Sequence, residues 1–248
     1  MSDHMEEFPG PPQFLTTHWS LVGAASPDEA SQTRARAALE ELCRTYWYPL
    51  YAFVRSKGHS AVDAQDLTQA FFTRIIEKGG FATADRERGR FRSYLLGAMK
   101  HFLANEWHRA QTQKRGGQVQ FVDWDALDPE SRYIEMSDTS DNPEYVFDRE
   151  WAVEIVTTAL DTLRHEMTNS GKSDHFEVLK GSLTGEDGTT REEMAARLDM
   201  TGEAVKVAIH RLRKRYRDLL RAAIAETVSN EADLDDEMRY LVEVLRRQ

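Results

Sequence analysis

The chain has 248 residues, which is long enough for one large domain or two small ones. Its residues are 40% hydrophobic and 30% charged, which suits a soluble globular protein, and its formal charge is −10. No run of 18 apolar residues occurs, which argues against a membrane span, and the acidic N-terminus argues against a secretory signal. The single cysteine, Cys43, excludes an internal disulfide and a multi-cysteine zinc site, and it favours the reducing cytoplasm.

The first half of the chain predicts three helices after an N-terminal extension at residues 1–35. The first helix runs from Ser31 to Ser56, where Pro49 should kink it or divide it in two. The second begins at Ser60 and stops at the glycine pair 79–80. Its apolar face is expected at Val62, Leu67, Phe71 and Ile75, with Phe72 and Ile76 beside it. The third is "FRSYLLGAMKHFLANEWHRAQTQKR", with an inward stripe of Phe91, Leu95, Met99, Phe102, Leu103 and Trp107.

Residues 118–143 have little apolar periodicity, many acids and two prolines, which indicates a linker between two domains. A helix is then expected from Pro143 onward, in "EYVFDREWAVEIVTTALDTLRHEM". Its inward residues are Val146, Trp151, Ile155, Ala159 and Leu163. A last, acidic helix is expected from about Glu231 to Arg247, with an apolar face of Leu234, Met238, Leu241, Val242 and Leu245.

The stretch "TREEMAARLDMTGEAVKVAIHRLRKRYRDLL" predicts two helices joined by a three-residue turn. Thr190 and Glu193 form a capping box for the first helix, and Thr201 caps the second. The second helix has one inward stripe, Val205, Ile209, Leu212 and Tyr216. This arrangement is typical of a helix-turn-helix, whose second helix enters the DNA major groove. An ordinary helical hairpin with a solvent-exposed basic face would give the same pattern.

Positive charge gathers in two segments of this acidic chain. The segment from Arg86 to Arg115 contains eight Lys or Arg residues and two acids. The segment from Glu203 to Arg221 contains seven Lys or Arg residues and two acids. The intervening segment from Asp123 to Glu150 has ten acids and two arginines. Two basic segments on either side of an acidic one suggest two contacts with a polyanion, and two solvated helix faces are the simpler alternative.

Together these stretches resemble a bacterial RNA polymerase sigma factor of the extracytoplasmic-function (ECF) type, in the sigma-70 family. The resemblance covers about residues 36–115 and 149–225. "AVDAQDLTQAFFTRIIEK" resembles the helix that docks on the coiled coil of the polymerase β′ subunit. "FRSYLLGAMKHFLANEWHRAQTQKR" resembles the helix that melts and reads the promoter −10 element. "TREEMAARLDMTGEAVKVAIHRLRKRYRDLL" is similar to the −35 helix-turn-helix of these factors.

The resemblance implies an all-α fold of two helical domains with a C-terminal addition. Residues 36–117 would form the −10 and polymerase-docking domain, 118–148 an acidic linker, 149–225 the −35 domain, and 226–248 an acidic C-terminal helix. The implied function is to bind core RNA polymerase, through its β′ coiled coil and β flap, and to direct promoter recognition, −10 melting and initiation. No catalysis, cofactor, metal or membrane contact is implied.

Three sets of contact residues are expected from the motifs and the resemblance. Contacts to −10 DNA are expected at Arg86, Arg88, Arg90, Arg92, Tyr94, Lys100, His101, Asn105, His108, Arg109, Lys114 and Arg115. Contacts to −35 DNA are expected at Thr201, Glu203, Lys206, Val207, His210, Arg211, Arg213, Lys214 and Arg217. Docking on core polymerase is expected at Asp63, Asp66, Gln69, Phe72 and Thr73. Phe91 could stack on an extruded base, but its place in the apolar stripe favours core packing.

The chain departs from the family pattern at several positions. Ala70 stands where the docking helix usually has an acid, and Asp199 occupies the turn position usually given to Gly. His101 and Asn105 replace the Asn and Asp that are usual in the −10 helix. Promoter sequence therefore cannot be copied from relatives.

Regulation by other proteins or by the C-terminal helix is expected, and two roles are open for the acidic linker. A Ser/Thr kinase acting on Thr68 or Thr73 would restore the charge missing at Ala70, and an anti-sigma factor is a further conceivable partner. The acidic linker either threads through the polymerase cleft or is a plain tether. The C-terminal helix either packs near the basic −35 helix and tempers DNA binding, or stabilises its own domain.

Two other functions compete with this interpretation. A helix-turn-helix regulator that binds duplex DNA alone would normally dimerise on spaced half-sites, and it would leave the docking-like helix unexplained. An enzyme is disfavoured because no nucleophile–base pair or phosphate loop occurs. The stretch "HFLANEWH" could place His101, Asn105 and His108 on one face, but it is not a His-Glu-x-x-His zinc motif.

Overall fold

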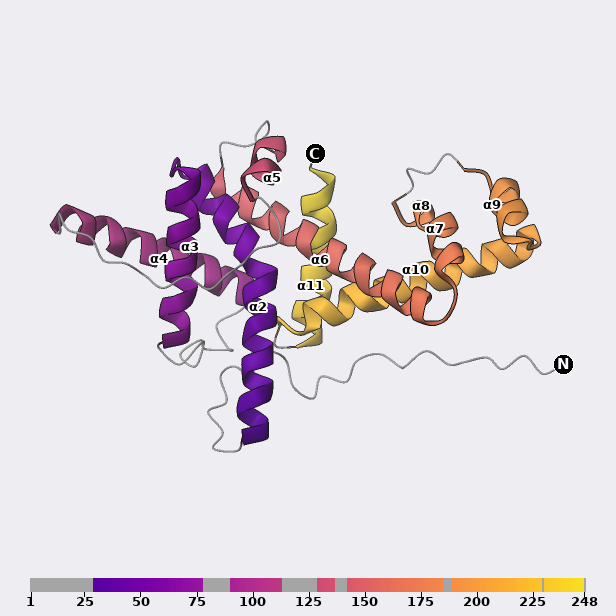
Figure 1. The fold of residues 1–248 in the computed structure, drawn as a ribbon, viewed down its shortest axis with the longest axis horizontal. Coiled ribbons are helices and arrows are strands. Elements are labelled where there is room, and N and C mark those ends of the chain that lie inside the picture. The colour runs from indigo at the N-terminus through magenta and orange to yellow at the C-terminus, as the bar shows by residue number, and fades with distance from the viewer. Residues whose placement is uncertain are drawn as a thin grey trace. The chain divides into compact units, whose positions relative to one another are not determined.

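The computed structural model describes residues 29–77, 90–112, 129–136, 142–184, 189–228 and 230–247. Within these ranges the regular structure consists of ten helices and no strands, which confirms the all-α class (Figure 1). None of the helices in the described ranges combines the length and the apolar character needed to cross a bilayer.

The described residues divide into two compact units. The first unit contains those between 29 and 155 together with those between 224 and 247, and the second contains those between 156 and 223. The boundaries lie inside two helices, α6 (Pro143–Asn169) and α10 (Gly202–Ala225). They therefore differ from the boundaries at 148 and 225 expected from the sequence, and they group the C-terminal helix α11 (Glu231–Arg246) with the first unit.

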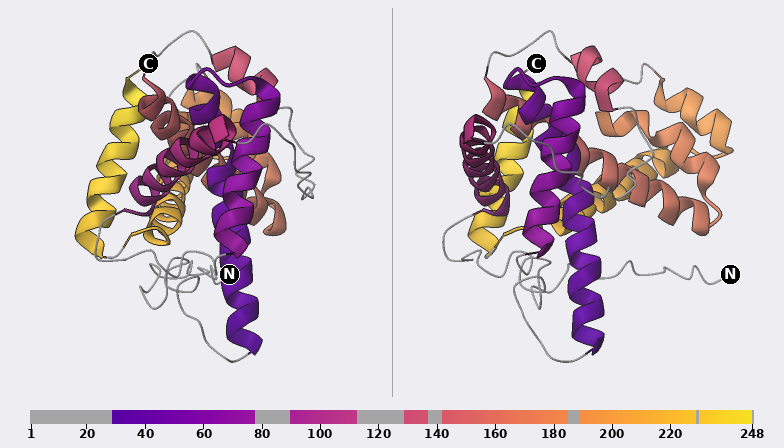
Figure 2. Two further views of the ribbon diagram at one scale, coloured as in Figure 1. Left: turned by 90° about the vertical axis from the view of Figure 1, so that its left-hand side faces the viewer. Right: turned by 60° about the vertical axis from the view of Figure 1, so that its left-hand side comes forward.

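The first unit is built on α2 (Glu29–Ser56), α3 (Ala61–Glu77) and α4 (Phe91–Thr112). α2 and α3 lie side by side, joined by a short turn that contains Gly58 at φ 92 (Figure 2). α2 is one helix that continues through Pro49, so of the two outcomes expected there, a kink or a division, the division is wrong. Aromatic rings fill the core: Phe91 meets Tyr46 edge-on at 5.2 Å between ring centroids, and Phe71 meets Phe102 at 5.6 Å. Phe91 is fully buried, as its place in the apolar stripe predicted.

Cys43 should be almost unreactive while the protein is folded. It is buried in α2, and burial, followed by the nearby charge of Glu40, raises its pKa from 9.0 to about 12. Because the thiolate is the reactive form, the thiolate fraction near neutral pH is lower by roughly three orders of magnitude. A colorimetric thiol reagent should label less than a tenth of the protein in the time that labels it fully in denaturant. Rapid labelling of the native chain would contradict this buried position.

Part of the expected acidic linker is an ordered helix of the first unit. The helix α5 (Pro129–Met136) carries Glu130, which accepts hydrogen bonds from the Tyr51 hydroxyl at 2.6 Å and from Arg55 Nε at 2.8 Å. Arg132 lies 3.7 Å from the centre of the Tyr48 ring and pairs with Glu150 of α6 at 2.9 Å. This segment is therefore fixed to α2 and α6 instead of serving as a plain tether. Residues 113–128 and 137–141 lie outside the described ranges.

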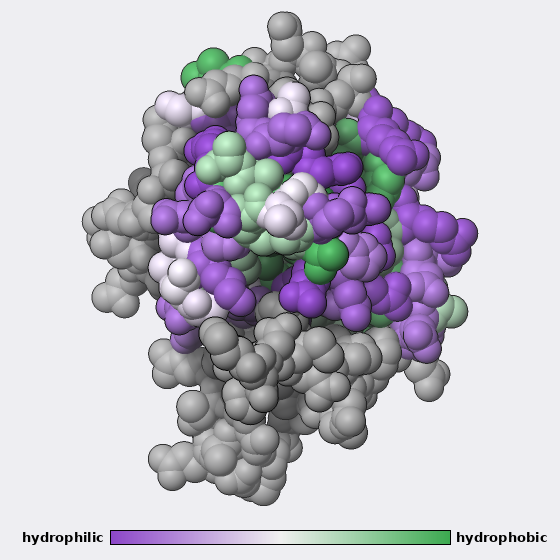
Figure 3. Space-filling model, turned by 90° about the vertical axis from the view of Figure 1, so that its right-hand side faces the viewer, coloured by the Kyte–Doolittle hydropathy of each residue, from purple (hydrophilic) through white to green (hydrophobic). Residues whose placement is uncertain are grey.

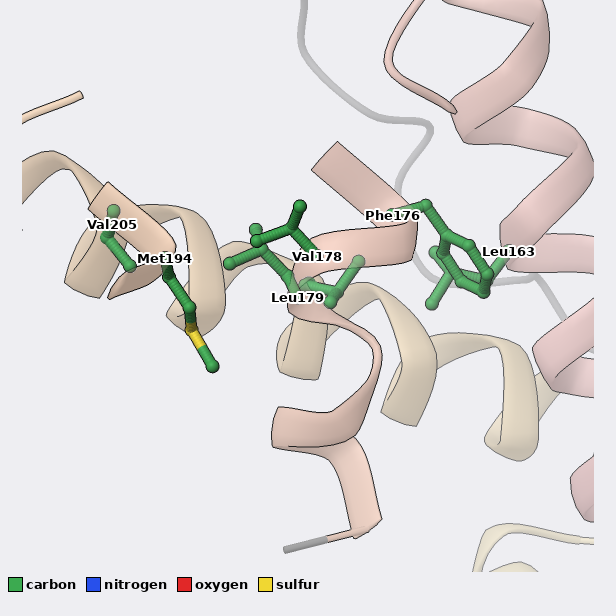
Figure 4. Close-up of a cluster of buried hydrophobic side chains, with 7 residues drawn as sticks. Leu163, Phe176, Val178, Leu179, Met194 and Val205 are labelled. Atoms are coloured by element: carbon green, nitrogen blue, oxygen red, sulfur yellow. The ribbon is translucent and has the colours of Figure 1, made fainter. Parts of the chain in front are cut away.

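The second unit packs four helices around one apolar cluster (Figure 4). They are the second half of α6, α7 (Ser173–Leu179), α9 (Arg191–Leu198) and α10, with the single turn α8 (Gly181–Thr184) after α7. The cluster consists of Leu163, Phe176, Val178, Leu179, Met194, Val205 and Leu212. All five residues predicted to face inward on α6 are buried, and they divide between the cores of the two units.

Candidate nucleic-acid interface

The turn between α9 and α10 has the capping chemistry that the sequence predicted. Thr190 Oγ1 accepts a hydrogen bond from the Glu193 amide at 3.2 Å, and the Glu193 carboxylate accepts one from the Thr190 amide at 2.7 Å. Thr201 Oγ1 accepts from the Ala204 amide at 3.2 Å and so caps α10. Each cap satisfies backbone donors that the helix start leaves unpaired, and both helices therefore begin where the side chains specify.

Asp199 ends α9 in the left-handed region, with φ 51 and ψ 47. Its amide donates to the Ala195 carbonyl, which closes the last turn of the helix. Glycine is the usual residue in this conformation, but aspartate tolerates it better than most others do. The substitution noted in the sequence is therefore compatible with a tight turn between the two helices.

α10 divides cleanly into an inner and an outer side. Val205 and Leu212 are buried, and Ile209 and Tyr216 are half-buried against the same cluster. All nine residues predicted to contact −35 DNA are exposed: Thr201, Glu203, Lys206, Val207, His210, Arg211, Arg213, Lys214 and Arg217. In the view from the side on which α9 and the start of α10 lie, the described residues are mainly hydrophilic, with smaller hydrophobic areas (Figure 3). We call this set of nine side chains the outer face of α10.

Two arginines of α10 hold the second unit together. Arg215 Nε donates to Glu166 of α6 at 2.8 Å, and this hydrogen bond raises the pKa of the guanidinium. Arg213 donates to the Ser182 carbonyl at 2.7 and 3.1 Å and so ties α8 to α10. Arg213 is therefore exposed, but its guanidinium is already engaged in hydrogen bonds to the Ser182 carbonyl. Lys206, Arg211, Lys214 and Arg217 remain as exposed cations, and Lys206 lies 3.9 Å from the Glu203 carboxylate.

The basic N-terminus of α4 is occupied by carboxylates of the first unit. Arg92, predicted to contact DNA, is only 8% exposed, with Nε 2.9 Å from Glu237 and Nη1 2.6 Å from Asp148. Burial disfavours its charge, but Glu237 and Asp148 outweigh that effect and raise the pKa of the guanidinium. Arg90 also pairs with Glu237, at 2.9 Å. The expected DNA contact of Arg92 is therefore corrected: its side chain is a buried structural cation.

The carboxylate at the centre of this cluster was missed in the sequence. Glu237 is 1% exposed and lies in register with Leu234, Leu241 and Val244 on the buried side of α11. Tyr240 adds a hydrogen bond to Asp148 at 2.6 Å, and its ring lies 4.2 Å from the Arg92 guanidinium. Burial, and then the bond to Asp148, raises the pKa of Tyr240 to about 12. Positions 234, 237, 241 and 244 follow one another at helical spacing, which could have indicated that Glu237 is buried. The spacing was overlooked because the residue at 237 is an acid.

The polar contacts of α11 thus lie with α4 and α6. The segment before α11 reaches the same place, because the Phe91 amide donates to the Thr227 carbonyl at 3.3 Å. Tyr145 of α6 donates from its hydroxyl to the Arg247 carbonyl at 3.2 Å. These neighbours differ from the basic −35 helix expected beside α11, and they fit the alternative in which α11 stabilises the unit that contains it.

The other residues predicted to contact −10 DNA differ in their exposure and in their partners. Lys100 is exposed and pairs with Glu144, His101 is exposed, and Tyr94 and Asn105 are half-buried. Trp107, expected in the inward stripe, is 62% exposed, so that assignment is wrong. His108 and Arg109 belong to α4, but their side chains lie outside the described part of the chain, as do residues Arg86, Arg88, Lys114 and Arg115 altogether.

α3 turns most of its predicted apolar face inward, but two residues of that face point outward. Ala64, Thr68, Phe71 and Phe72 are buried. Val62 is 69% exposed and Ile76 51% exposed, which contradicts the expected inward position of Val62 and corrects the docking role of Phe72. Asp63 and Asp66 are exposed, and Gln69 and Thr73 are half-buried. Five of these outward residues recur at steps of four and three, and we call them the α3 stripe: Val62, Asp66, Gln69, Thr73 and Ile76.

The two threonines proposed for phosphorylation have different environments. Thr68 is fully buried, and its hydroxyl donates to the Ala64 carbonyl at 2.7 Å. A kinase could not reach it in the folded chain, so the hypothesis for Thr68 is withdrawn. The Thr73 hydroxyl donates to the Gln69 carbonyl at 2.9 Å, and its side chain is half-buried.

Among the described residues, no group of three His, Cys, Asp or Glu side chains is placed to hold a metal ion. In comparisons with protein-family models, with curated proteins and with solved structures, the chain matched none of them.

Proposed function

We propose that this chain is a sigma-type initiation subunit, which binds core RNA polymerase and brings the outer face of α10 to promoter DNA. The observation that carries the proposal is the separation of roles along α10: Val205 and Leu212 are buried, and all nine predicted DNA contacts are exposed. The second helix of a helix-turn-helix places its N-terminal residues at base edges and its later cations at phosphates. Arg211, Lys214 and Arg217 hold the later positions.

The α3 stripe supports the polymerase-binding half of the proposal. Its exposed apolar ends, Val62 and Ile76, enclose a polar centre that includes Asp66. A stripe at steps of three and four matches the surface of another helix, as in helix-on-helix packing. Polymerase core would then be held by two apolar anchors and one acidic contact to a basic partner helix.

The exposed cations of α10 should determine how strongly DNA binding depends on salt. Each phosphate contact contributes about 0.9 to the slope of log affinity against log salt concentration. Replacing Arg211 and Lys214 together by Gln should therefore lower that slope by about two and weaken binding to all sequences alike. Lys180→Gln, which removes an exposed cation paired with Glu177 outside this face, is the matched control and should leave the slope unchanged. Fluorescence anisotropy at four or more salt concentrations measures both quantities.

Run-off transcription with purified core polymerase and genomic fragments tests the whole proposal. Discrete transcripts are expected with the wild-type chain and not with core polymerase alone. Absence of transcripts on every template, together with no association between the chain and core polymerase, would contradict it.

A regulator that binds duplex DNA alone is the second candidate, and one observation favours it. Arg92 and Arg90, which were expected to serve the −10 element, are paired with Glu237 in the first unit. A protein that only needs its helix-turn-helix would tolerate that arrangement. Tight sequence-specific binding by the chain in the absence of polymerase, with no transcript in its presence, would favour this candidate.

A further inference from the structure

Val207 is a hydrophobic residue on the otherwise polar outer face of α10. Its side chain is 47% exposed, while Val205, two positions earlier, is completely buried. Ala208 and Ile209 pack against the core cluster of the second unit, and Val207 is not among the described residues that do so. Valine is a weaker helix former than Arg, Lys, Gln or Glu, so the fold gains little from a valine at this exposed position.

The neighbours of Val207 indicate which part of DNA this position would meet. Glu203 lies one helical turn earlier on the same row of the helix, and its carboxylate is exposed beside Lys206 at 3.9 Å. A carboxylate aimed at the phosphate backbone would be repelled, but at a base edge it can accept a hydrogen bond from the amino group of cytosine. The row of Glu203 and Val207 is therefore better suited to base edges, and the cations Arg211 and Lys214 to phosphates.

Only one base presents an apolar group in the major groove, namely thymine with its 5-methyl group. We propose that Val207 is a specificity-determining residue that contacts the methyl group of a thymine in the recognised duplex. This inference rests on the proposed function, because it requires α10 to lie in the major groove. Four residues of helix span about 6 Å, so the thymine is expected close to the base pair that Glu203 faces.

The test removes the methyl group without disturbing base pairing. Duplexes are first selected from a random library, with the full chain alone and with the chain bound to core polymerase. Each thymine of the selected site is then replaced singly by deoxyuridine. One replacement should weaken binding by the wild-type chain about fourfold, the effect of exposing one buried methyl group. The Val207→Ala variant should bind the thymine duplex about as weakly as the wild type binds the uracil duplex, and it should not respond to the replacement.

Two matched variants complete the experiment. Val207→Thr keeps one methyl group at the same place and should retain part of the response. Val242→Ala removes an exposed valine of α11, outside α10, and should behave as the wild type. If duplexes are selected but every thymine tolerates uracil, or if Val207→Ala keeps the full response, the inference is wrong while the proposed function stands. If neither the chain nor its polymerase complex selects any duplex, both fail.

Discussion

Replacing Glu237 by Gln should lower the free energy of unfolding of the first unit by about 3 kcal/mol, because it leaves two arginines beside a neutral side chain in a buried place. Glu237 is the partner of both Arg90 and Arg92, at 2.9 Å in each case. Removing one partner of a buried ion pair typically costs about 3–5 kcal/mol, and the lower end applies here because Asp148 still pairs with Arg92. Glutamine keeps the volume and one acceptor, so the loss is electrostatic.

Two measurements report on this variant. Urea unfolding followed by circular dichroism gives the stability, and hydrogen exchange of the amides of α11 shows whether the helix detaches before the rest unfolds. The control is Glu243→Gln, which removes an exposed pair with Arg247 on the same helix and should cost less than about 0.5 kcal/mol. Equal, small effects of the two substitutions would mean that the buried cluster contributes nothing to stability.

Charge reversal on the α3 stripe should abolish most of the affinity for core polymerase if the proposed function holds. Asp66→Arg places a cation at the polar centre of the stripe, between Gln69 and Val62. It replaces an attraction to a basic partner by a repulsion, and like charges facing each other at an interface cost several kcal/mol. The expected loss is at least tenfold, with the fold unaffected because the side chain is exposed.

The comparison must separate docking from general acidity. Asp161→Arg reverses another exposed acid, on α6, whose ion pair within the described ranges is a local one with Arg164, and it should leave polymerase affinity unchanged. Val62→Ser and Ile76→Ser test the apolar ends of the stripe and should weaken binding without changing its salt dependence. Co-sedimentation or surface binding with core polymerase measures all four variants. Full affinity of Asp66→Arg would exclude the α3 stripe as the docking surface.

The exposed and buried sides of a helix were predicted correctly where one sequence pattern dominated. On α10 the apolar residues form one narrow row among charges, so only one side of the helix can face a core, and the exposed set followed directly. The caps at Thr190 and Thr201 are equally local, since a hydroxyl and an amide three residues apart specify them. Local interactions of this kind can be inferred from sequence alone.

The first unit shows what such patterns leave open. α3 has apolar residues on two sides: Phe71 faces inward as predicted, but only packing against α2 and α4 decided that Val62 and Ile76 face outward. The pairing of Arg92 with Glu237 joins residues 145 positions apart, and no local pattern links them. An acid or an arginine in a sequence is read as a surface residue, because burying either one alone is unfavourable.

The sequence by itself therefore determined the helical class, the two capped helices α9 and α10 and the exposed cationic side of α10, because these depend on periodicity and on caps within a few residues. Only the tertiary structure decided that α11 joins α4 and α6, that α5 is fixed to α2, and that Arg92 is buried. The physical reason is that a buried charge becomes favourable only when distant segments bring its partners within hydrogen-bond reach, and that meeting is a property of the fold.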